Sequence, residues 1–292
     1  MEIYKISWGT HSLELGGRTH VMGILNVTPD SFSDGGKYFS LEAAVAHGEK
    51  LVADGADIID IGGESTRPFS DPIPPEEEIR RVVPVIEKLA ARISIPISID
   101  TTKAIVAGRA IEAGASIIND IGALRLDDDM AGVAVKYEVP VILMHMLGTP
   151  RTMQIVPAYD DLMGEIKAFF EDAIRTAEKK GIPKSKIIID PGIGFGKTID
   201  HNLYLIKHLH EFNSLNVPVL IGPSRKSFIR NILKDKKGKD AGSDMSSIVG
   251  TGSQAAIAVA VLHGAHIVRA HDVAETCATI NIVDAINHVA SG

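Results

Sequence analysis

The chain has 292 residues, of which 45% are hydrophobic and 23% are charged, and its formal net charge is −7. This composition is typical of a globular protein with a large core, and the length fits one α/β barrel or two ordinary domains. The negative charge argues against a general nucleic-acid binder, which would carry a basic excess. If such a protein handles anions, it must gather its cations locally.

The single cysteine, Cys277, excludes a disulfide within the chain and suits a reducing compartment. The first residues lack the basic start and apolar run of a signal peptide, and no apolar stretch reaches the roughly 20 residues of a membrane span. We therefore expect a cytoplasmic protein with neither a membrane nor a nucleic-acid partner.

Residues 1–20 predict a short β-hairpin that turns at Gly16 and Gly17, and from residue 21 apolar runs alternate with amphipathic segments. The predicted strands are residues 21–28, 58–63, 96–101, 117–121, 139–145, 187–190, 217–221 and 267–269. The predicted helices are residues 41–54, 76–91, 104–113, 128–137, 161–180, 202–212, 246–262 and 274–289. Glycine follows four of these helices, as helix C-termini commonly require, at positions 55, 114, 181 and 264.

Eight strand–helix pairs predict one closed (β/α)8 barrel, a TIM barrel, with residues 1–292 as a single domain and the hairpin at its N-terminus. A doubly wound open sheet is the main alternative. It is weakened because no Gly-x-Gly-x-x-Gly turn follows the first strand. Residues 234–246 are rich in Lys, Asp, Gly and Ser, which predicts a solvated loop.

Polar side chains recur near the ends of seven strands. Because alternate residues of a strand share a face, we expect these side chains to point into the barrel mouth. For any one residue, a strand-end hydrogen bond is the simpler interpretation, but seven convergent cases indicate a site. The residues that share a face are Ile24 and Asn26, Ser98 and Asp100, Ile117 and Asn119, Leu143 and His145, Ile188 and Asp190, Gly222 and Ser224, and Ile267 with Arg269 and His271.

The loops add groups to the same mouth. Residues 224–227 (SRKS) place two cations and two hydroxyls where a buried strand ends. Phe32 and Arg67 lie in the loops after the first two strands, which suits a lid over a substrate. The glycine-rich residues 190–197 (DPGIGFGK) allow a ligand to approach the backbone but lack the Walker spacing.

Two kinds of site are disfavoured. The histidines are scattered without zinc-ligand spacing, and Ser224 has neither a Gly-x-Ser-x-Gly elbow nor an adjacent base for covalent catalysis. A Mg²⁺ held mainly by substrate phosphates would need only one or two protein oxygens.

Eight segments, in order along the chain, resemble the signatures of the dihydropteroate synthase family. The resemblance covers the chain from Val21 to the last predicted helix. It implies an enzyme of folate biosynthesis that condenses 6-hydroxymethyl-7,8-dihydropterin pyrophosphate with 4-aminobenzoate and releases pyrophosphate. The segments are residues 22–36 (MGILNVTPDSFSDGG), 60–68 (DIGGESTRP), 98–101 (SIDT), 118–121 (INDI), 144–146 (MHM), 190–197, 224–227 and 269–272 (RAHD).

The resemblance implies that the pterin is bound by Asp100, Asn119, Asp190 and Lys226. Asp190 would accept hydrogen bonds from the guanidine-like edge of the pterin, and Asn119 would both donate and accept beside it. Lys226 would donate to the carbonyl edge. Asp100 would stabilise positive charge on the pterin methylene while pyrophosphate departs in an SN1-like substitution.

The pyrophosphate is implied to be held by Asn26, Thr66, Arg269 and His271, with Asn26 as a ligand of Mg²⁺. Neutralising the charge of the leaving group would let positioning and electrostatics carry the reaction. The residues implied in catalysis are Asp100, Lys226, Arg269 and Asn26.

The 4-aminobenzoate would lie beside a helix that begins at Ser224, whose N–H groups would face its carboxylate. Phe69 stands where the family commonly has a small residue, so we expect this loop either to sit differently or to narrow the 4-aminobenzoate entrance, and sulfonamide sensitivity is left open. The family also implies a homodimer. The residues implied to contact 4-aminobenzoate are Phe32, Thr66, Arg67, Pro68, Phe195 and Ser224.

Two alternatives share the predicted barrel. A methyltetrahydrofolate–corrinoid methyltransferase would have similar pterin contacts but no need for residues 224–227, for Arg269 with His271, or for Arg67. A non-catalytic pterin-binding paralogue would have lost some of these groups, and none is lost.

Overall fold

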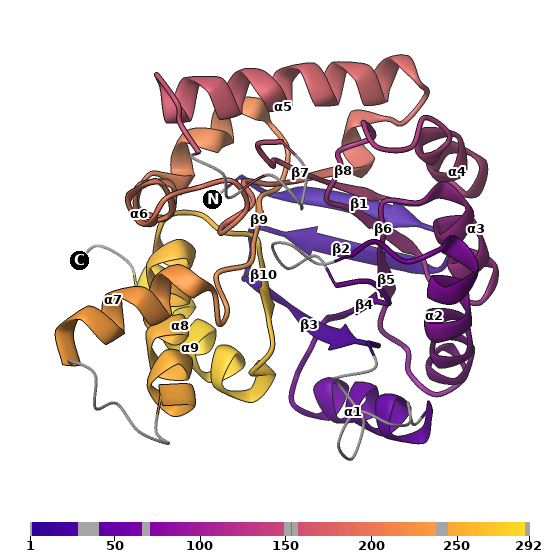
Figure 1. Cartoon of the computed structure of the whole chain (residues 1–292), viewed down its shortest axis with the longest axis horizontal. Coiled ribbons are helices and arrows are strands. Elements are labelled where there is room, and N and C mark those ends of the chain that lie inside the picture. The colour runs from indigo at the N-terminus through magenta and orange to yellow at the C-terminus, as the bar shows by residue number, and fades with distance from the viewer. Residues whose placement is uncertain are drawn as a thin grey trace.

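The structure is a computed structural model that describes residues 2–28, 41–65, 71–148, 153, 157–237 and 245–289. Its central sheet has eight parallel strands in the order β8-β7-β6-β5-β4-β3-β10-β9. An isolated bridge between Ile189 and Val219 brings the two edges of the sheet together, which confirms the predicted barrel (Figure 1). The strands are β3 (His20–Asn26), β4 (Ile58–Gly62), β5 (Ile97–Asp100), β6 (Ile117–Asp120), β7 (Val141–Met144), β8 (Ile187–Asp190), β9 (Leu220–Ile221) and β10 (Ile267–Ala270).

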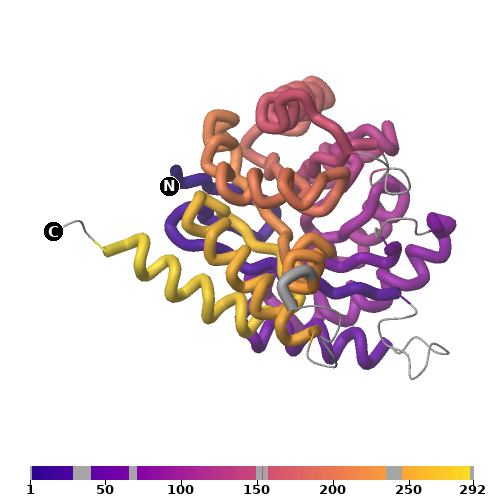
Figure 2. Tube along the Cα trace, turned by 60° about the vertical axis from the view of Figure 1, so that its left-hand side comes forward, coloured from indigo at the N-terminus to yellow at the C-terminus, as the bar shows by residue number. Residues whose placement is uncertain are grey.

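Helices surround the barrel, as the trace in Figure 2 shows from a second direction. The α-helices are α1 (Leu41–Ala53), α2 (Pro75–Ala90), α3 (Ala104–Glu112), α4 (Met130–Tyr137), α5 (Leu162–Lys179), α6 (Ile199–Lys207), α7 (Ser227–Lys237), α8 (Met245–Leu262) and α9 (Val273–Asn287). Two 3₁₀ helices are η1 (Lys184–Lys186) and η2 (Leu209–Leu215). The four glycines predicted to end helices all have φ between 96° and 119°, a conformation that costs other residues strain.

Three predicted elements differ from the structure. The N-terminal hairpin pairs β1 (Tyr4–Trp8) with β2 (His11–Leu15) and turns at Gly9 and Thr10, so the turn predicted at Gly16 and Gly17 is wrong. Gly9 has φ +48°, as the first residue of a two-residue hairpin loop requires. The single helix predicted at residues 202–212 is replaced by α6 and η2. Helix α7 occupies the start of the predicted loop at residues 234–246 and precedes α8 as an extra helix.

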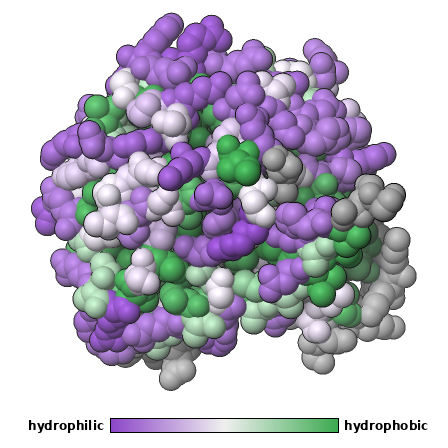
Figure 3. All heavy atoms as spheres, turned by 180° about the vertical axis from the view of Figure 1, so that it is seen from behind, coloured by the Kyte–Doolittle hydropathy of each residue, from purple (hydrophilic) through white to green (hydrophobic). Residues whose placement is uncertain are grey.

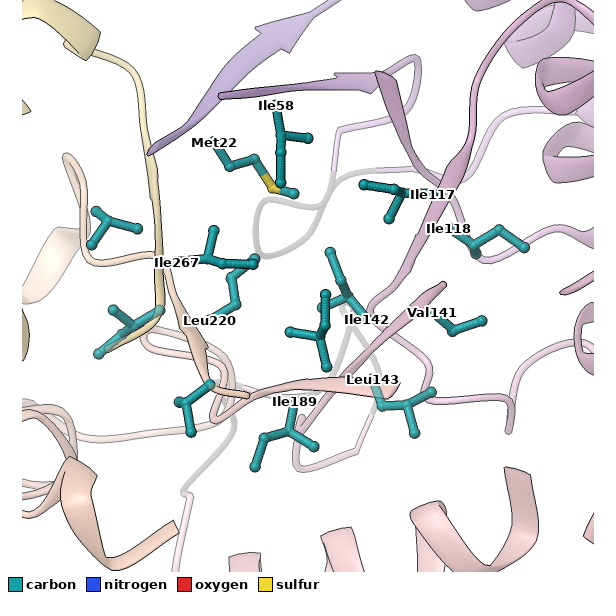
Figure 4. Close-up of a cluster of buried hydrophobic side chains, with 14 of the residues drawn as sticks. Met22, Ile58, Ile117, Ile118, Val141, Ile142, Leu143, Ile189, Leu220 and Ile267 are labelled. Atoms are coloured by element: carbon teal, nitrogen blue, oxygen red, sulfur yellow. The ribbon is translucent and has the colours of Figure 1, made fainter. Parts of the chain in front are cut away.

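In the barrel interior, inward-facing apolar side chains from different strands lie close together (Figure 4). Met22, Ile58, Ile117 and Ile142 point inward, whereas neighbours such as Val141 face the helices. In β7 this places Ile142 and Met144 on the inner face. The prediction that Leu143 and His145 face the mouth is therefore wrong.

The N-terminal end of the barrel is covered by the hairpin. Tyr4 packs edge-on against the ring of His266, just before β10, and β1 contacts η1, just before β8. Two carboxylates hold the chain that enters β3. Asp57 accepts a hydrogen bond from the N–H of Val21, and Asp284 accepts from both the N–H and the hydroxyl of Thr19. Since this end is closed by protein groups, the opposite end is where a ligand can enter.

Candidate active site

The strand register places three predicted site residues in one row at the C-terminal end of the barrel, with Gly62 between the first two. Asn26 of β3 lies opposite Gly62 of β4, Gly62 lies opposite Asp100 of β5, and Asp100 lies opposite Asn119 of β6. Asp190 ends β8, and Arg269 reaches the same end from β10. Residues that are distant in the sequence are thus gathered at the barrel mouth because each parallel strand ends there.

Arg269 is the centre of a charged cluster in this mouth. Its Nε donates to Oδ2 of Asp60 at 2.6 Å, and its Nη2 donates to Oδ2 of Asp100 at 2.7 Å. Asn119 Nδ2 donates to the same Asp60 oxygen at 3.0 Å. One carboxylate therefore joins the residue implied in pyrophosphate binding to a residue implied in pterin binding.

Asp60 was not among the predicted site residues, although it is fully buried and central to the cluster. The signal was present in the sequence. Asp60 is the only charged residue in β4, and it alternates with Ile58 and Gly62 on the inner face. A lone carboxylate on the inner face of a barrel strand requires a partner inside the barrel, which is the role that Arg269 fills.

Two carboxylate oxygens of the cluster can each accept a further hydrogen bond. The Oδ1 atoms of Asp60 and Asp100 are buried, and neither has a hydrogen-bond partner within the described part of the chain. Burial raises the pKa of Asp100 to about 7, with the nearby carboxylates of Asp60 and Glu78 adding to the rise and Arg269 opposing it. Such an acceptor carries a strong preference for a ligand that brings N–H groups or positive charge.

Asp190 and Lys226 form a second part of the mouth. Asp190 is buried, its Oδ1 accepts from the N–H of Gly192 at 2.7 Å, and burial raises its pKa. Lys226 Nζ stands 4.0 Å from the centre of the Phe195 ring. Burial lowers the pKa of Lys226 to about 8, and the positive charge of Arg269 lowers it further against the pull of Asp190. This part of the site offers a carboxylate, a cation and an aromatic face side by side.

Ser224 and His271 are joined directly. The N–H of His271 donates to the Ser224 hydroxyl oxygen at 3.2 Å, and that hydroxyl lies 3.1 Å from Nδ1 of His271. Burial, Arg269 and Arg225 lower the pKa of His271 to about 3, so the ring is neutral at pH 7. The resemblance implies that these two residues serve different substrates, and the structure places them in direct contact.

The backbone after β9 differs from the prediction at one point. Helix α7 begins at Ser227, so the helix expected to begin at Ser224 starts three residues later. Arg225 has φ +56°, its N–H donates to Ser253, and its guanidinium pairs with both carboxylate oxygens of Asp272. Arg225 is thus an ion-pair partner that fixes this turn.

Four of the predicted site residues, Phe32, Thr66, Arg67 and Pro68, lie outside the described residues, as does Phe69. The structure brings the others to one end of the barrel. Within the described ranges no group of three or more His, Cys, Asp or Glu side chains has the arrangement of a metal site.

Comparison with known proteins agrees with this geometry. The family model described as "Pterin binding enzyme" matches residues 22–271. The dihydropteroate synthase of Synechocystis sp. is 44% identical over 95% of this chain and 93% of its own length. That of Escherichia coli is 45% identical over 94% of this chain and 93% of its own length. The chain belongs to the dihydropteroate synthase family.

Solved structures of the family have the same fold. The dihydropteroate synthase of Yersinia pestis, in a sulfonamide drug complex, superposes with a TM-score of 0.89 at 43% identity, covering 98% of this chain and 100% of its own. That of Xanthomonas albilineans, with 4-aminobenzoic acid, gives 0.89 at 43% identity, covering 99% of this chain and 100% of its own. The chain is a transferase of the dihydropteroate synthase type, an enzyme of folate biosynthesis.

Proposed function

We propose that the barrel mouth condenses 6-hydroxymethyl-7,8-dihydropterin pyrophosphate with 4-aminobenzoate, with the pterin held by Asp100, Asn119, Asp190 and Lys226. The observation that carries this division is the set of buried, incompletely paired carboxylates around Arg269. A pterin presents N–H donors along one edge, and buried carboxylates accept such donors strongly. The complex of a relative from Xanthomonas albilineans with 7,8-dihydropteroate supports the same ligand class.

The same carboxylates support an SN1-like substitution. When pyrophosphate leaves, positive charge develops on the pterin methylene, and fixed negative groups nearby stabilise it. Three N–H bonds of the Arg269 guanidinium are not directed at Asp60 or Asp100, and these are available to the leaving anion. The neutral ring of His271 adds a hydrogen-bond donor without adding charge. The reaction needs no general base, because the attacking aromatic amine is weakly basic and is neutral before it attacks.

Mg²⁺ fits the donors that are present. Asn26 ends β3, partly exposed, in the same row as Asp100, and an amide oxygen is a ligand that Mg²⁺ accepts. A bound Mg²⁺ would neutralise part of the pyrophosphate charge. Asn26 would hold it together with phosphate oxygens, while Arg269 and His271 orient the leaving group.

The 4-aminobenzoate is proposed to lie against Phe195, near Ser224, with Phe32, Thr66, Arg67 and Pro68 completing its subsite. Support comes from the contact of Phe195 with Lys226, which sets the aromatic wall of one subsite against the cation of the other. Sulfonamides would occupy this subsite, as the drug complex of the Yersinia pestis relative suggests.

A homodimer is supported by apolar exposure on two packed helices. Helices α8 and α9 contact each other along the barrel wall, and α8 is apolar enough to cross a membrane by length and composition although only 28% of it is buried. Seen from behind, the surface is largely hydrophilic, with hydrophobic residues at several places and more of them in the lower half (Figure 3). A second copy of the chain that covered the exposed apolar side chains of α8 and α9 would remove them from water. The exposed apolar residues of this pair are Val259, Leu262, Ile282 and Ile286.

A cytoplasmic location is proposed on the single cysteine, which forms no internal disulfide.

One assay tests the reaction: release of pyrophosphate that depends on the pterin pyrophosphate, on 4-aminobenzoate and on Mg²⁺. We expect Arg67→Ala mainly to raise the KM for 4-aminobenzoate, whereas Lys226→Ala abolishes pterin binding. Tight pterin binding without pyrophosphate release would refute the synthase reaction. Equal effects of both variants on both substrates would refute the division of the site.

A further inference from the structure

Lys197, at the end of the glycine-rich loop after β8, is a buried lysine that faces away from the cluster around Arg269. Only 4% of its surface is exposed. Its Nζ donates to the carbonyl of Phe195 at 3.0 Å and to the carbonyl of His145 at 3.4 Å, and it lies 3.0 Å from Nδ1 of His145. Three acceptors match the three donors of an ammonium group. Burying such a group is costly, so its position needs an explanation.

The loop that Lys197 closes is wrapped tightly on the end of β7. Gly192, Gly194 and Gly196 all have positive φ. A Cβ at Gly192 would lie 2.0 Å from the carbonyl oxygen of His145, and one at Gly196 would lie 2.7 Å from Cβ of Leu147. The loop can follow this path only because these positions have no side chain. Lys197 then fixes its far end to His145, directly after β7.

This loop begins and nearly ends with predicted ligand-binding residues. Asp190 precedes it, and its Oδ1 accepts from the loop N–H of Gly192. Phe195, whose carbonyl accepts from Lys197, carries the ring that lies beneath Lys226. A shift of the Lys197 anchor would therefore move the carboxylate proposed for the pterin and the ring proposed for 4-aminobenzoate together.

We propose that Lys197 is a positioning residue of the condensation, which ties the loop after β8 to His145 and thereby holds Asp190 and Phe195 for the two substrates. The proposal rests on the proposed function. His145 supplies the acceptor because its ring is packed edge-on against Phe169 of α5 at 4.9 Å and is fixed in orientation. Burial, Lys197 and Arg125 lower the pKa of His145 to about 2, so the ring is neutral, and in the tautomer with the proton on Nε2 its Nδ1 accepts from the Lys197 ammonium.

Lys197 also acts on Asp190 through its charge. Its positive charge opposes the burial that raises the pKa of Asp190. Burial lowers the pKa of Lys197 itself to about 7, Asp190 raises it and Lys226 lowers it. The charged or titratable groups that face this anchor are His145 after β7, Asp190 of β8 and Lys226 after β9. Arg125 after β6 acts on the ring of His145, and Tyr159 lies against that ring and donates to the carbonyl of Gly196. Without the Lys197 charge, Asp190 takes up a proton at a higher pH.

The test compares Lys197→Met with wild type and with Lys186→Met. Lys186 is a matched control because its Nζ also donates to a backbone carbonyl, that of Glu138, but at the other end of β8. Wild-type pyrophosphate release is measured first, so that failure of the reaction itself is seen separately. For each variant, the KM of both substrates is measured, together with binding of 6-hydroxymethyl-7,8-dihydropterin across pH.

We expect Lys197→Met to raise both KM values about tenfold, and the acid limb of pterin binding to move up by roughly half a pH unit or more because a nearby cation is lost. His145→Phe keeps the aromatic packing and the lysine charge. It should raise both KM values about threefold and leave the acid limb in place. If Lys197→Met does not fold, unchanged KM values in His145→Phe overturn the proposal. A loss of thermal stability in Lys197→Met with unchanged KM values and an unchanged acid limb also overturns it, because Lys197 would then serve folding alone.

Discussion

The two ends of the barrel both contain charged side chains, but they use them in opposite ways. At the N-terminal end, Asp57 and Asp284 accept hydrogen bonds from the chain that enters β3. At the mouth, Asp60 and Asp100 are paired with the side chain of Arg269, and each keeps one oxygen without a partner in the described ranges. Carboxylates at the first end complete the fold, whereas carboxylates at the second await a ligand. Substitutions at the two ends should therefore separate stability from activity.

Among substitutions at the mouth, Lys226→Ala should lower activity the most while leaving stability nearly unchanged. We expect pterin binding to be lost and kcat/KM to fall by about 10⁴-fold or more, because the site then lacks the donor for the pterin carbonyl. The free energy of unfolding should change by less than about 1 kcal/mol, because a desolvated cation contributes little net stability. Steady-state kinetics and urea unfolding of the same preparation measure both quantities. A stability loss that accounts for the lost activity would remove the distinction between the two ends.

Asp284→Ala is the matching change at the N-terminal end. It removes the acceptor of two hydrogen bonds from Thr19, and we expect a loss of about 2–3 kcal/mol of unfolding free energy. Activity of the folded fraction should stay within about twofold of wild type, since conserving the mouth geometry conserves the reaction. Urea titration and pyrophosphate release at low temperature check this. A specific loss of kcat in the folded protein would contradict it.

Asp60→Asn should have an intermediate effect and sharpen the comparison inside the mouth. An amide oxygen can still accept from Asn119 or Arg269, but the negative charge that orients the guanidinium is lost. We expect kcat/KM to fall about 10- to 100-fold, or about 1.4–2.7 kcal/mol. Asp57→Asn at the N-terminal end is the control, expected to act on stability alone. An Asp60→Asn enzyme with wild-type kinetics would show that Arg269 needs only Asp100.

The pH dependence should differ in sign between the ends. Asp100 has a pKa of about 7 in the folded protein, above its usual value. Its contribution to the free energy of unfolding is therefore lost as the pH rises from about 4 to 7. Burial lowers the pKa of His266 to about 4, so its contribution to the free energy of unfolding is lost as the pH falls from about 6.5 to 4. Urea unfolding across pH should show Asp100→Asn gaining stability relative to wild type as the pH rises through this window. A constant difference would refute the shifted pKa.

The pH dependence of activity should depend only on groups at the mouth, and it should be the smallest of these effects. With Asp100 near 7 and Lys226 near 8, the pH profile of kcat/KM should be a narrow bell limited by these two groups. Asp284→Asn should leave both limbs in place. A limb that moves in this variant would mean that the two ends are coupled.

Much of the barrel was predictable because its signal is local. The alternation of apolar runs and amphipathic segments predicted eight strand–helix pairs, and the period of two correctly placed Asp100, Asn119, Asp190 and Arg269 at the mouth. The period fails where both faces of a strand are apolar. In β7, Val141–Met144, the sequence does not distinguish the inner set from the outer one, and His145 was placed on the wrong side.

The remaining site features depend on contacts between distant segments. Arg269 meets Asp60 across 209 positions of sequence, and no local pattern encodes that pairing. Lys197 ends a glycine-rich motif that was interpreted only as letting a ligand approach the backbone, so its burial against His145 was not predicted. Roles of individual residues, the single-domain description of residues 1–292, Mg²⁺ and the homodimer stay predictions.

The closure of the barrel has a consequence for how the molecule opens. The edges of the sheet meet at one isolated bridge, Ile189 with Val219, supported by the N–H of Ile189 donating to the carbonyl of Pro218. Strand β9 has only two residues and is flanked by Pro218 and Pro223, which donate no backbone hydrogen bond. Local unfolding begins where few ladder bonds hold the backbone. Amide hydrogens near Ile189 and Leu220 should therefore exchange with solvent before those of β4 and β5. A bound pterin that contacts both Asp190 and Lys226 should slow this exchange, because it would link the segments on either side of the junction between β8 and β9.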